Sequence, residues 1–85
     1  MPSLYGQVVG VWAYAGWHGA DEGRTIAADW HVLPNKACVW LAGWGTMRVE
    51  DTGRAIVGAA VDVFMDRHED ALAFGRKVLE IKPCQ

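Results

Sequence analysis

The sequence predicts an α+β domain in which an antiparallel four-stranded β-meander is packed on one face by a single C-terminal amphipathic helix. Runs rich in β-branched and aromatic residues, separated by glycine, proline and asparagine, fill most of the chain. Apolar residues at helical spacing are prominent only in its last part. With 85 residues, 52% of them hydrophobic and 21% charged, the chain 1–85 is expected to form one globular domain.

The first two strands are expected over 4–15 and 25–33. The first has apolar residues on both of its alternating faces. The second alternates more cleanly, and its predicted apolar side carries Ile26, Ala28, Trp30 and Val32. The glycine-rich and acidic segment 16–23 between them predicts a loop that is longer than a tight hairpin turn.

The third and fourth strands are expected over 37–49 and 54–65. The third is again apolar on both faces, and its glycines beside tryptophans either leave room for a neighbouring ring or mark a bulge. The β-branched content of 54–65 favours a strand. Its apolar residues also fit helical spacing, so a second helix over 53–65 is the alternative.

The helix is expected over 67–82. Asp66 followed three residues later by Glu69 resembles a capping arrangement at a helix start. Pro83 is expected to end the helix. The apolar stripe that would face the sheet consists of Ala71, Leu72, Phe74, Gly75, Val78, Leu79 and Ile81.

One face of this sheet lacks an obvious cover. A helix of about 15 residues is about 22 Å long and covers a single face of four strands. The segments 4–15 and 37–49 are nevertheless apolar on both faces, which is typical of strands buried on both sides. A homo-oligomer, a dimer or larger, packed sheet to sheet would bury the second face. The alternative is a strongly curled sheet or partial barrel that buries this face on itself.

The chain contains five tryptophans, and most of their area is expected to fill the core and the oligomer interface. A second interpretation is an aromatic-walled cleft for a small flat, sugar-like or cationic ligand or for a peptide. The residues predicted to form that ligand or partner site are Trp17, His18, Trp30, His31, Trp40, Trp44 and Arg48. Trp17 is the leading candidate because a tryptophan in a loop has less reason to exist for packing.

The sequence offers only weakly supported candidates for catalytic groups. Asp29 and His31 share one face of the second predicted strand, where the carboxylate would orient the imidazole as a general base, although a structural pair is the preferred interpretation. Asp62 interrupts an apolar stretch and is expected to form an ion pair with Arg48 or Arg54. The histidines are not spaced as metal ligands and the glycines match no nucleotide-binding motif, so no metal or cofactor is expected.

Cys38 and Cys84 show no CxxC spacing, and both are expected to be free thiols, with a disulfide between them as the less favoured alternative. The sequence lacks a signal-peptide pattern and an apolar run long enough to span a membrane, which predicts a cytoplasmic protein without a membrane partner. The net charge of −2 and the scattered lysines and arginines predict no nucleic-acid partner.

The leading functional hypothesis is a non-enzymatic binding or assembly module that acts as a homo-oligomer with a tryptophan-rich ligand or partner surface. Two alternatives stay open. One is a small enzyme whose Asp29 and His31 meet a neighbouring chain at a subunit interface. The other is a regulatory protein that pairs with a different chain.

Overall fold

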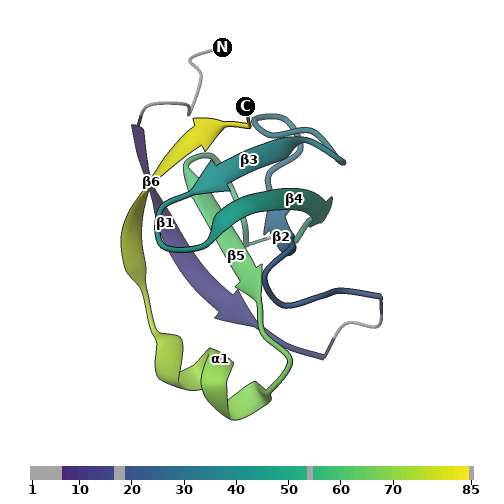
Figure 1. The fold of residues 1–85 in the computed structure, drawn as a ribbon, viewed down its shortest axis with the longest axis vertical. Coiled ribbons are helices and arrows are strands. Elements are labelled where there is room, and N and C mark those ends of the chain that lie inside the picture. The colour runs from purple at the N-terminus through teal and green to yellow at the C-terminus, as the bar shows by residue number, and fades with distance from the viewer. Residues whose placement is uncertain (1–6, 17–18, 54, 85) are drawn as a thin grey trace.

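The computed structural model describes residues 7–16, 19–53 and 55–84. In these residues, six strands close into a barrel and one short helix lies at its end (Figure 1). The elements are β1 Gln7–Tyr14, β2 Thr25–Ala28, β3 Cys38–Leu41, β4 Gly45–Asp51, β5 Ala60–Phe64, α1 His68–Phe74 and β6 Lys77–Pro83. No helix in the described part of the chain has the length and apolarity needed to cross a bilayer.

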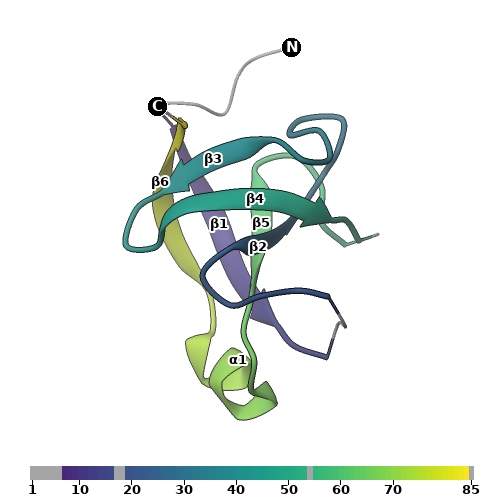
Figure 2. The same ribbon diagram turned by 45° about the vertical axis from the view of Figure 1, so that its right-hand side comes forward.

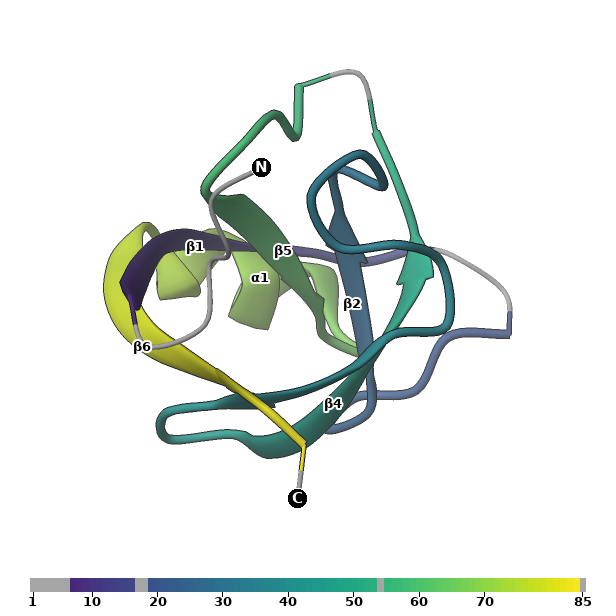
Figure 3. The same cartoon turned by 90° about the horizontal axis from the view of Figure 1, so that it is seen from above.

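The predicted antiparallel meander is wrong, because the sheet is mixed and six-stranded. The strand order around the barrel is β1-β5-β2-β4-β3-β6, and β6 pairs with β1 to close it (Figure 3). β1 is parallel to β5 and β2 is parallel to β4, whereas the other four pairs are antiparallel. Only β3 and β4 are neighbours both in the chain and in the barrel, where they form the hairpin at the front of Figure 2.

The interior of the barrel is apolar, because alternate residues of each strand point inward. The core residues are at most 3% exposed, and they are Val9, Val11, Ile26, Ala28, Leu33, Val39, Leu41, Met47, Val49, Val61, Val63 and Ile81. The curled sheet considered as an alternative is therefore close to the observed arrangement. Closure removes the reason for a sheet-to-sheet dimer, and homo-oligomerisation remains a prediction that light scattering tests.

The predicted third strand, 37–49, is two strands. Residues 42–44 form the turn between β3 and β4, where the Trp44 amide donates to the Leu41 carbonyl at 2.9 Å. Gly43 and Gly45 on either side of Trp44 have φ angles of +82° and +85°, which favour glycine. These glycines therefore reverse the chain instead of making room for a ring.

Two other predicted strands are shorter than expected. β2 ends at Ala28, because the amides of Val32 and Leu33 both donate to the Asp29 carbonyl at 2.9 Å and form a turn. β5 begins only at Ala60. The described residues between Asp51 and Ala60 form neither the predicted strand nor the alternative helix.

The predicted helix over 67–82 is wrong over its second half. α1 ends at Phe74, and Gly75 with φ +68° terminates it. Residues 77–83 form β6, which hydrogen-bonds to β1 on one side and β3 on the other. The capping arrangement is absent as well, since the helix begins after Arg67 without a side-chain cap, and the Asp66 amide donates to Glu22 at 3.1 Å.

Cys38 and Cys84 form a disulfide, which contradicts the prediction of free thiols. Cys38 begins β3, and Cys84 follows the last residue of β6. Because Val39 pairs with Pro83, the two cysteines stand on the next rung of the same antiparallel ladder, with their Cα atoms 5.5 Å apart. The bond joins residues that are 46 positions apart in the chain.

Candidate functional site

One row of residues crosses four neighbouring strands of the barrel. Asp51 in β4 pairs with Ala27 in β2, Ala27 pairs with Asp62 in β5, and Asp62 pairs with Trp12 in β1. The residues that alternate with this row fill the interior, so the row itself lies on the outer wall. The fold therefore places two carboxylates and an indole from distant parts of the chain on one surface.

A β-bulge brings a further acid to this wall. The pairing of β2 with β4 shifts so that Glu50 is the extra residue beside Asp51. The Glu50 carboxylate accepts hydrogen bonds from the Thr25 hydroxyl at 2.6 Å and the Arg24 guanidinium at 2.8 Å. Burial raises the pKa of Glu50, but these bonds and the charge of Arg24 outweigh it and lower the pKa overall. Glu50 is thus a paired, structural carboxylate.

Unlike Glu50, Asp62 is not held by an ion pair in the described part of the chain. It is half-buried, and burial raises the pKa of its carboxyl group. Arg48, one of its expected partners, donates instead to the Lys36 carbonyl at 2.9 Å, and Arg54, the other, lies outside the described residues. Asp62 is the aspartate on this wall whose protonated form the fold favours.

The Tyr14 phenol lies near these acids. Burial raises the pKa of Tyr14, and the carboxylates of Asp51, Asp62 and Glu50 raise it further. Of the three carboxylates, Asp51 raises the pKa of Tyr14 most. The buried Tyr14 hydroxyl nevertheless forms no hydrogen bond to any described residue. Tyr14 is thus a buried phenol beside the acidic wall, and its neutral form is favoured.

Asp62 lines a cleft of about 420 Å³, together with Trp12, Ala13, Ala55, Ile56 and Ala60. The Trp12 side of this cleft is well defined, because the Arg76 guanidinium carbon lies 5.2 Å from the centre of the indole ring. Gly10 packs closely against the same ring, since a Cβ atom at that position would lie 3.0 Å from it. Trp12 is still 39% exposed, so part of the held ring is open to a ligand.

A second cleft of about 430 Å³ adjoins the first. Its lining residues are Asp29, Trp30, His31, Thr52, Gly53, Ile56 and Val57. Ile56 lines both clefts, which places them side by side. Trp30 is 42% exposed, and its indole N–H donates to the Asp51 carbonyl at 3.0 Å. We call the two clefts together the acidic cleft.

The Asp29–His31 pair lies in a turn and not on a strand. One Asp29 oxygen accepts from the His31 amide at 3.0 Å and lies 3.2 Å from its Nδ1, while the other oxygen accepts from the Gly58 amide at 3.0 Å. The bond from Gly58, followed by that from His31, lowers the pKa of Asp29. The His31 side chain is 95% exposed. This geometry fits the structural interpretation, in which Asp29 ties the loop before β5 to the end of β2.

The other residues predicted for a ligand site are not brought together. Trp40 lies on a different wall, where Arg48 is also found. Trp44 packs against Phe74 of α1, with ring centres 6.1 Å apart. Trp17 and His18 lie outside the described residues. In the described part of the chain, no group of three or more histidine, cysteine or acidic side chains is placed to hold a metal ion.

Sequence reasoning missed Trp12, Tyr14 and Asp51 as site residues, and it assigned Asp62 to an ion pair. Each of the four was visible as a polar or aromatic residue in a strand or at its end. Their grouping depends on the pairing of β1 with β5 and of β2 with β4, which local patterns do not reveal.

Comparison with known proteins gives a consistent family assignment. The family model of the 3D domain matches residues 24–82. The cell wall-binding protein YocH of Bacillus subtilis (strain 168) is 37% identical over 59 residues, which cover 69% of this chain and 21% of that protein. The putative cell wall shaping protein YabE of the same organism is also 37% identical over 59 residues, covering 69% of this chain and 14% of that protein.

This chain therefore spans about a fifth or less of the length of these relatives. The matched region contains Asp29, Asp51 and Asp62, and it begins after Trp12 and Tyr14. It also contains five of the six described strands, β2 to β6, apart from the final residue of β6. Because the family model covers more than half of the chain, the chain belongs to the 3D domain family.

Proposed function

We propose that this chain is a cell wall-binding module and that the acidic cleft holds the glycan of the wall. The observation that carries the proposal is the pairing of an exposed indole with a carboxylate in each of two adjoining clefts, Trp12 with Asp62 and Trp30 with Asp29. The names of the two relatives, cell wall-binding protein and putative cell wall shaping protein, support this ligand class.

The chemistry of the cleft suits a sugar chain. A pyranose ring has a flat face of C–H groups, which packs on an indole, and a rim of hydroxyl and amide N–H groups, which donate to carboxylates. Each part of the cleft, at about 420 and 430 Å³, falls within the range of roughly 300–1,000 Å³ that is typical of small-molecule sites. The shared residue Ile56 supports binding of consecutive sugars along one surface.

A wall ligand also changes the expected location. The cytoplasmic location predicted from the sequence gives way to the proposal that the module works outside the cytoplasm. The Cys38–Cys84 disulfide supports this, because such bonds persist mainly in oxidising compartments.

Co-sedimentation with isolated bacterial cell walls tests the proposal. The variants Trp12→Ala and Trp30→Ala are expected to reduce the bound fraction severalfold, since each removes an indole of the kind that dominates binding energy at interfaces. Leu72→Ala is the matched control, because Leu72 is an exposed apolar residue on α1 that lines neither cleft. Binding by both tryptophan variants at the level of the control would reject the acidic cleft as the site.

One observation favours a second function, cleavage of the bound glycan. Asp62 lines the cleft and takes part in no ion pair among the described residues. Burial raises its pKa, which favours the protonated form that a general acid needs. Asp62 would protonate the glycosidic oxygen as the bond from this oxygen to the anomeric carbon breaks, releasing the leaving sugar as an alcohol. Water would then add to the anomeric carbon and lose its proton to a carboxylate of the same wall, for which Asp51, two strands from Asp62 in the row, is the candidate.

The two functions are separated by Asp62→Asn. This variant keeps the size and most of the hydrogen bonding of the side chain but has no acidic proton. If the chain cleaves glycan, it releases new reducing ends from isolated walls and Asp62→Asn does not, although both proteins sediment with the walls. Equal, background release by both proteins would leave wall binding as the function of the cleft.

A further inference from the structure

We infer that a pocket on the opposite wall of the barrel is a second binding site, which accepts a sugar carrying an anionic group. The pocket has a volume of about 270 Å³ and is lined by Trp40, Thr46, Lys82 and Pro83. It is centred on β3, which is three strands away from β5 in either direction around the barrel. We call it the Trp40 pocket.

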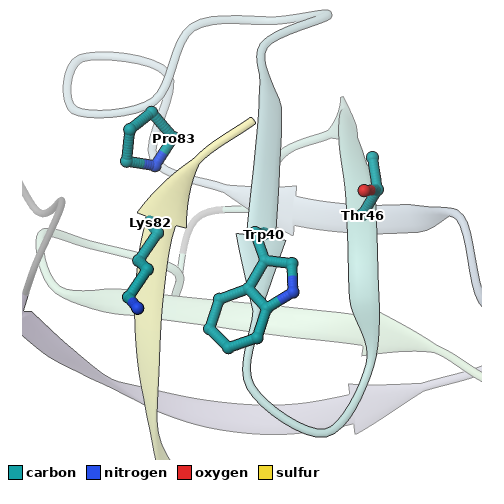
Figure 4. A pocket seen from close by; sticks show the side chains of 4 residues that line it. All are labelled: Trp40, Thr46, Lys82 and Pro83. Atoms are coloured by element: carbon teal, nitrogen blue, oxygen red, sulfur yellow. The ribbon is translucent and has the colours of Figure 1, made fainter. Parts of the chain in front are cut away.

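Strand pairing builds this pocket from a single row. Trp40 of β3 pairs with Thr46 of β4 on one side and with Lys82 of β6 on the other. Figure 4 shows the indole lying between the lysine and threonine side chains, with Pro83 above the lysine. An aromatic platform thus has a cation along one edge and a hydroxyl group along the other.

The chemistry of this row selects an anionic sugar. The Lys82 ammonium nitrogen lies 5.2 Å from the centre of the Trp40 ring. A sugar ring that packs on the indole can therefore place a carboxylate or phosphate against the ammonium and a hydroxyl group against Thr46. Arg48, two residues after Thr46 on the same face of β4, lies outside the lining of the pocket and adds positive charge to this wall.

Among the described residues, Lys82 forms one ion pair, which a ligand anion must replace. The Glu80 carboxylate lies 3.8 Å from the ammonium nitrogen, and both side chains are about half exposed. An exposed pair at this distance contributes little, so a ligand anion competes with it readily. Removing the charge of Glu80 should therefore strengthen binding.

The disulfide holds the edge of the pocket in place. Cys38 precedes Trp40 by two residues, and Cys84 follows Pro83 directly. The covalent bond keeps β3 and the end of β6 together and so preorganises the row that binds the sugar.

The ligand class rests on the proposed cell-wall function, because bacterial walls present anionic sugars of two sources. One source is the carboxylate of muramic acid, and the other is the phosphate of charged wall polymers. The shared chemistry is an acetamido sugar with a negative charge.

The test uses ¹⁵N-labelled full chain and follows the indole N–H signals by NMR. The probes are N-acetylmuramic acid, N-acetylglucosamine 1-phosphate and the neutral N-acetylglucosamine. The Trp40 signal is expected to shift with both anionic sugars, and the neutral sugar is expected to bind about two- to fivefold more weakly, which is the range of an exposed ion pair. The tighter of the two anionic probes identifies the source.

Two charge variants complete the test, and both replace half-exposed side chains, so that folding is retained. Lys82→Gln is expected to abolish the preference for anionic over neutral sugar, whereas Glu80→Gln is expected to increase it. The inference is overturned if no probe shifts the Trp40 signal, or if Lys82→Gln keeps the preference. The Trp12 and Trp30 signals report the acidic cleft separately, so failure of one site is distinguished from failure of the other.

Discussion

Loss of the Cys38–Cys84 bond is expected to remove a large part of the folding stability of this domain. The bond closes a loop between residues 46 positions apart. The chain entropy that such a cross-link removes from the unfolded state corresponds to about 4 kcal/mol at 25 °C. Domains are typically stable by only about 5–15 kcal/mol in total. The reduced protein is therefore expected to be marginally stable.

The structure indicates where the reduced protein should fail first. β3 and β6 are joined by only three pairs of residues, from Val39–Pro83 to Leu41–Ile81. The disulfide lies at the open end of this short ladder, next to the Val39–Pro83 pair, and joins β3 covalently to the end of β6. Without it, we expect hydrogen exchange to accelerate in β6 before it accelerates in β1 or β5.

Urea unfolding followed by circular dichroism measures the effect. With a slope of about 1 kcal/mol per molar urea for a small domain, the midpoint should fall by about 4 M on reduction. Cys38→Ser, Cys84→Ser and the double variant should all show the same loss, because each removes the same single bond. A double variant within about 1 kcal/mol of the oxidised protein would refute the entropic argument.

Three further predictions concern Asp62 of the acidic cleft and two residues near this cleft. Tyr14→Phe should leave the free energy of unfolding unchanged or raise it by up to about 1 kcal/mol, because it removes a buried hydroxyl without a described partner; a loss above about 1 kcal/mol in urea unfolding would contradict this. Burial raises the folded-state pKa of Asp62 above its unfolded value of about 4. The wild type should therefore lose stability as the pH rises from about 4 through the raised pKa, whereas Asp62→Asn should lack this loss, and parallel melting-temperature profiles of the two proteins would reject the assignment. Gly10→Ala should push the Trp12 ring aside, because the added Cβ would lie 3.0 Å from it, at a cost of about 1 kcal/mol; an unmoved Trp12 indole NMR signal would disprove this.

Local sequence patterns predicted the parts of the fold that depend on neighbouring residues. The alternation of Ile26 and Ala28 was correct for β2, and the helical pattern was correct for His68–Phe74. The same pattern failed after Gly75, because Leu79 and Ile81 also satisfy the alternation of a strand. Two sheet neighbours for β6 decided in favour of the strand, and neither neighbour is local in sequence.

The glycines marked chain reversals that the sequence analysis interpreted differently. Gly43, Gly45, Gly58 and Gly75 all have positive φ angles. Each lies where a predicted strand or helix is interrupted. Treated as chain reversals, they would have divided the third strand and shortened the helix.

The candidate site was predictable only in part. Trp30 and His31 were named from sequence and do line the acidic cleft. The row of Trp12, Asp62 and Asp51 was not, because its members meet through parallel pairs whose strands are far apart in the chain. Only the register of the paired strands shows that these three side chains lie on one wall.

The most direct test of the account is a titration of the ¹⁵N-labelled chain with a soluble tetrasaccharide of alternating N-acetylglucosamine and N-acetylmuramic acid. Binding in the acidic cleft predicts that the indole signals of Trp12 and Trp30 shift together and saturate at one ligand concentration. The Trp44 signal should stay in place, since that ring packs against Phe74. Saturable binding that leaves both Trp12 and Trp30 unmoved would contradict the assignment of the glycan to this cleft.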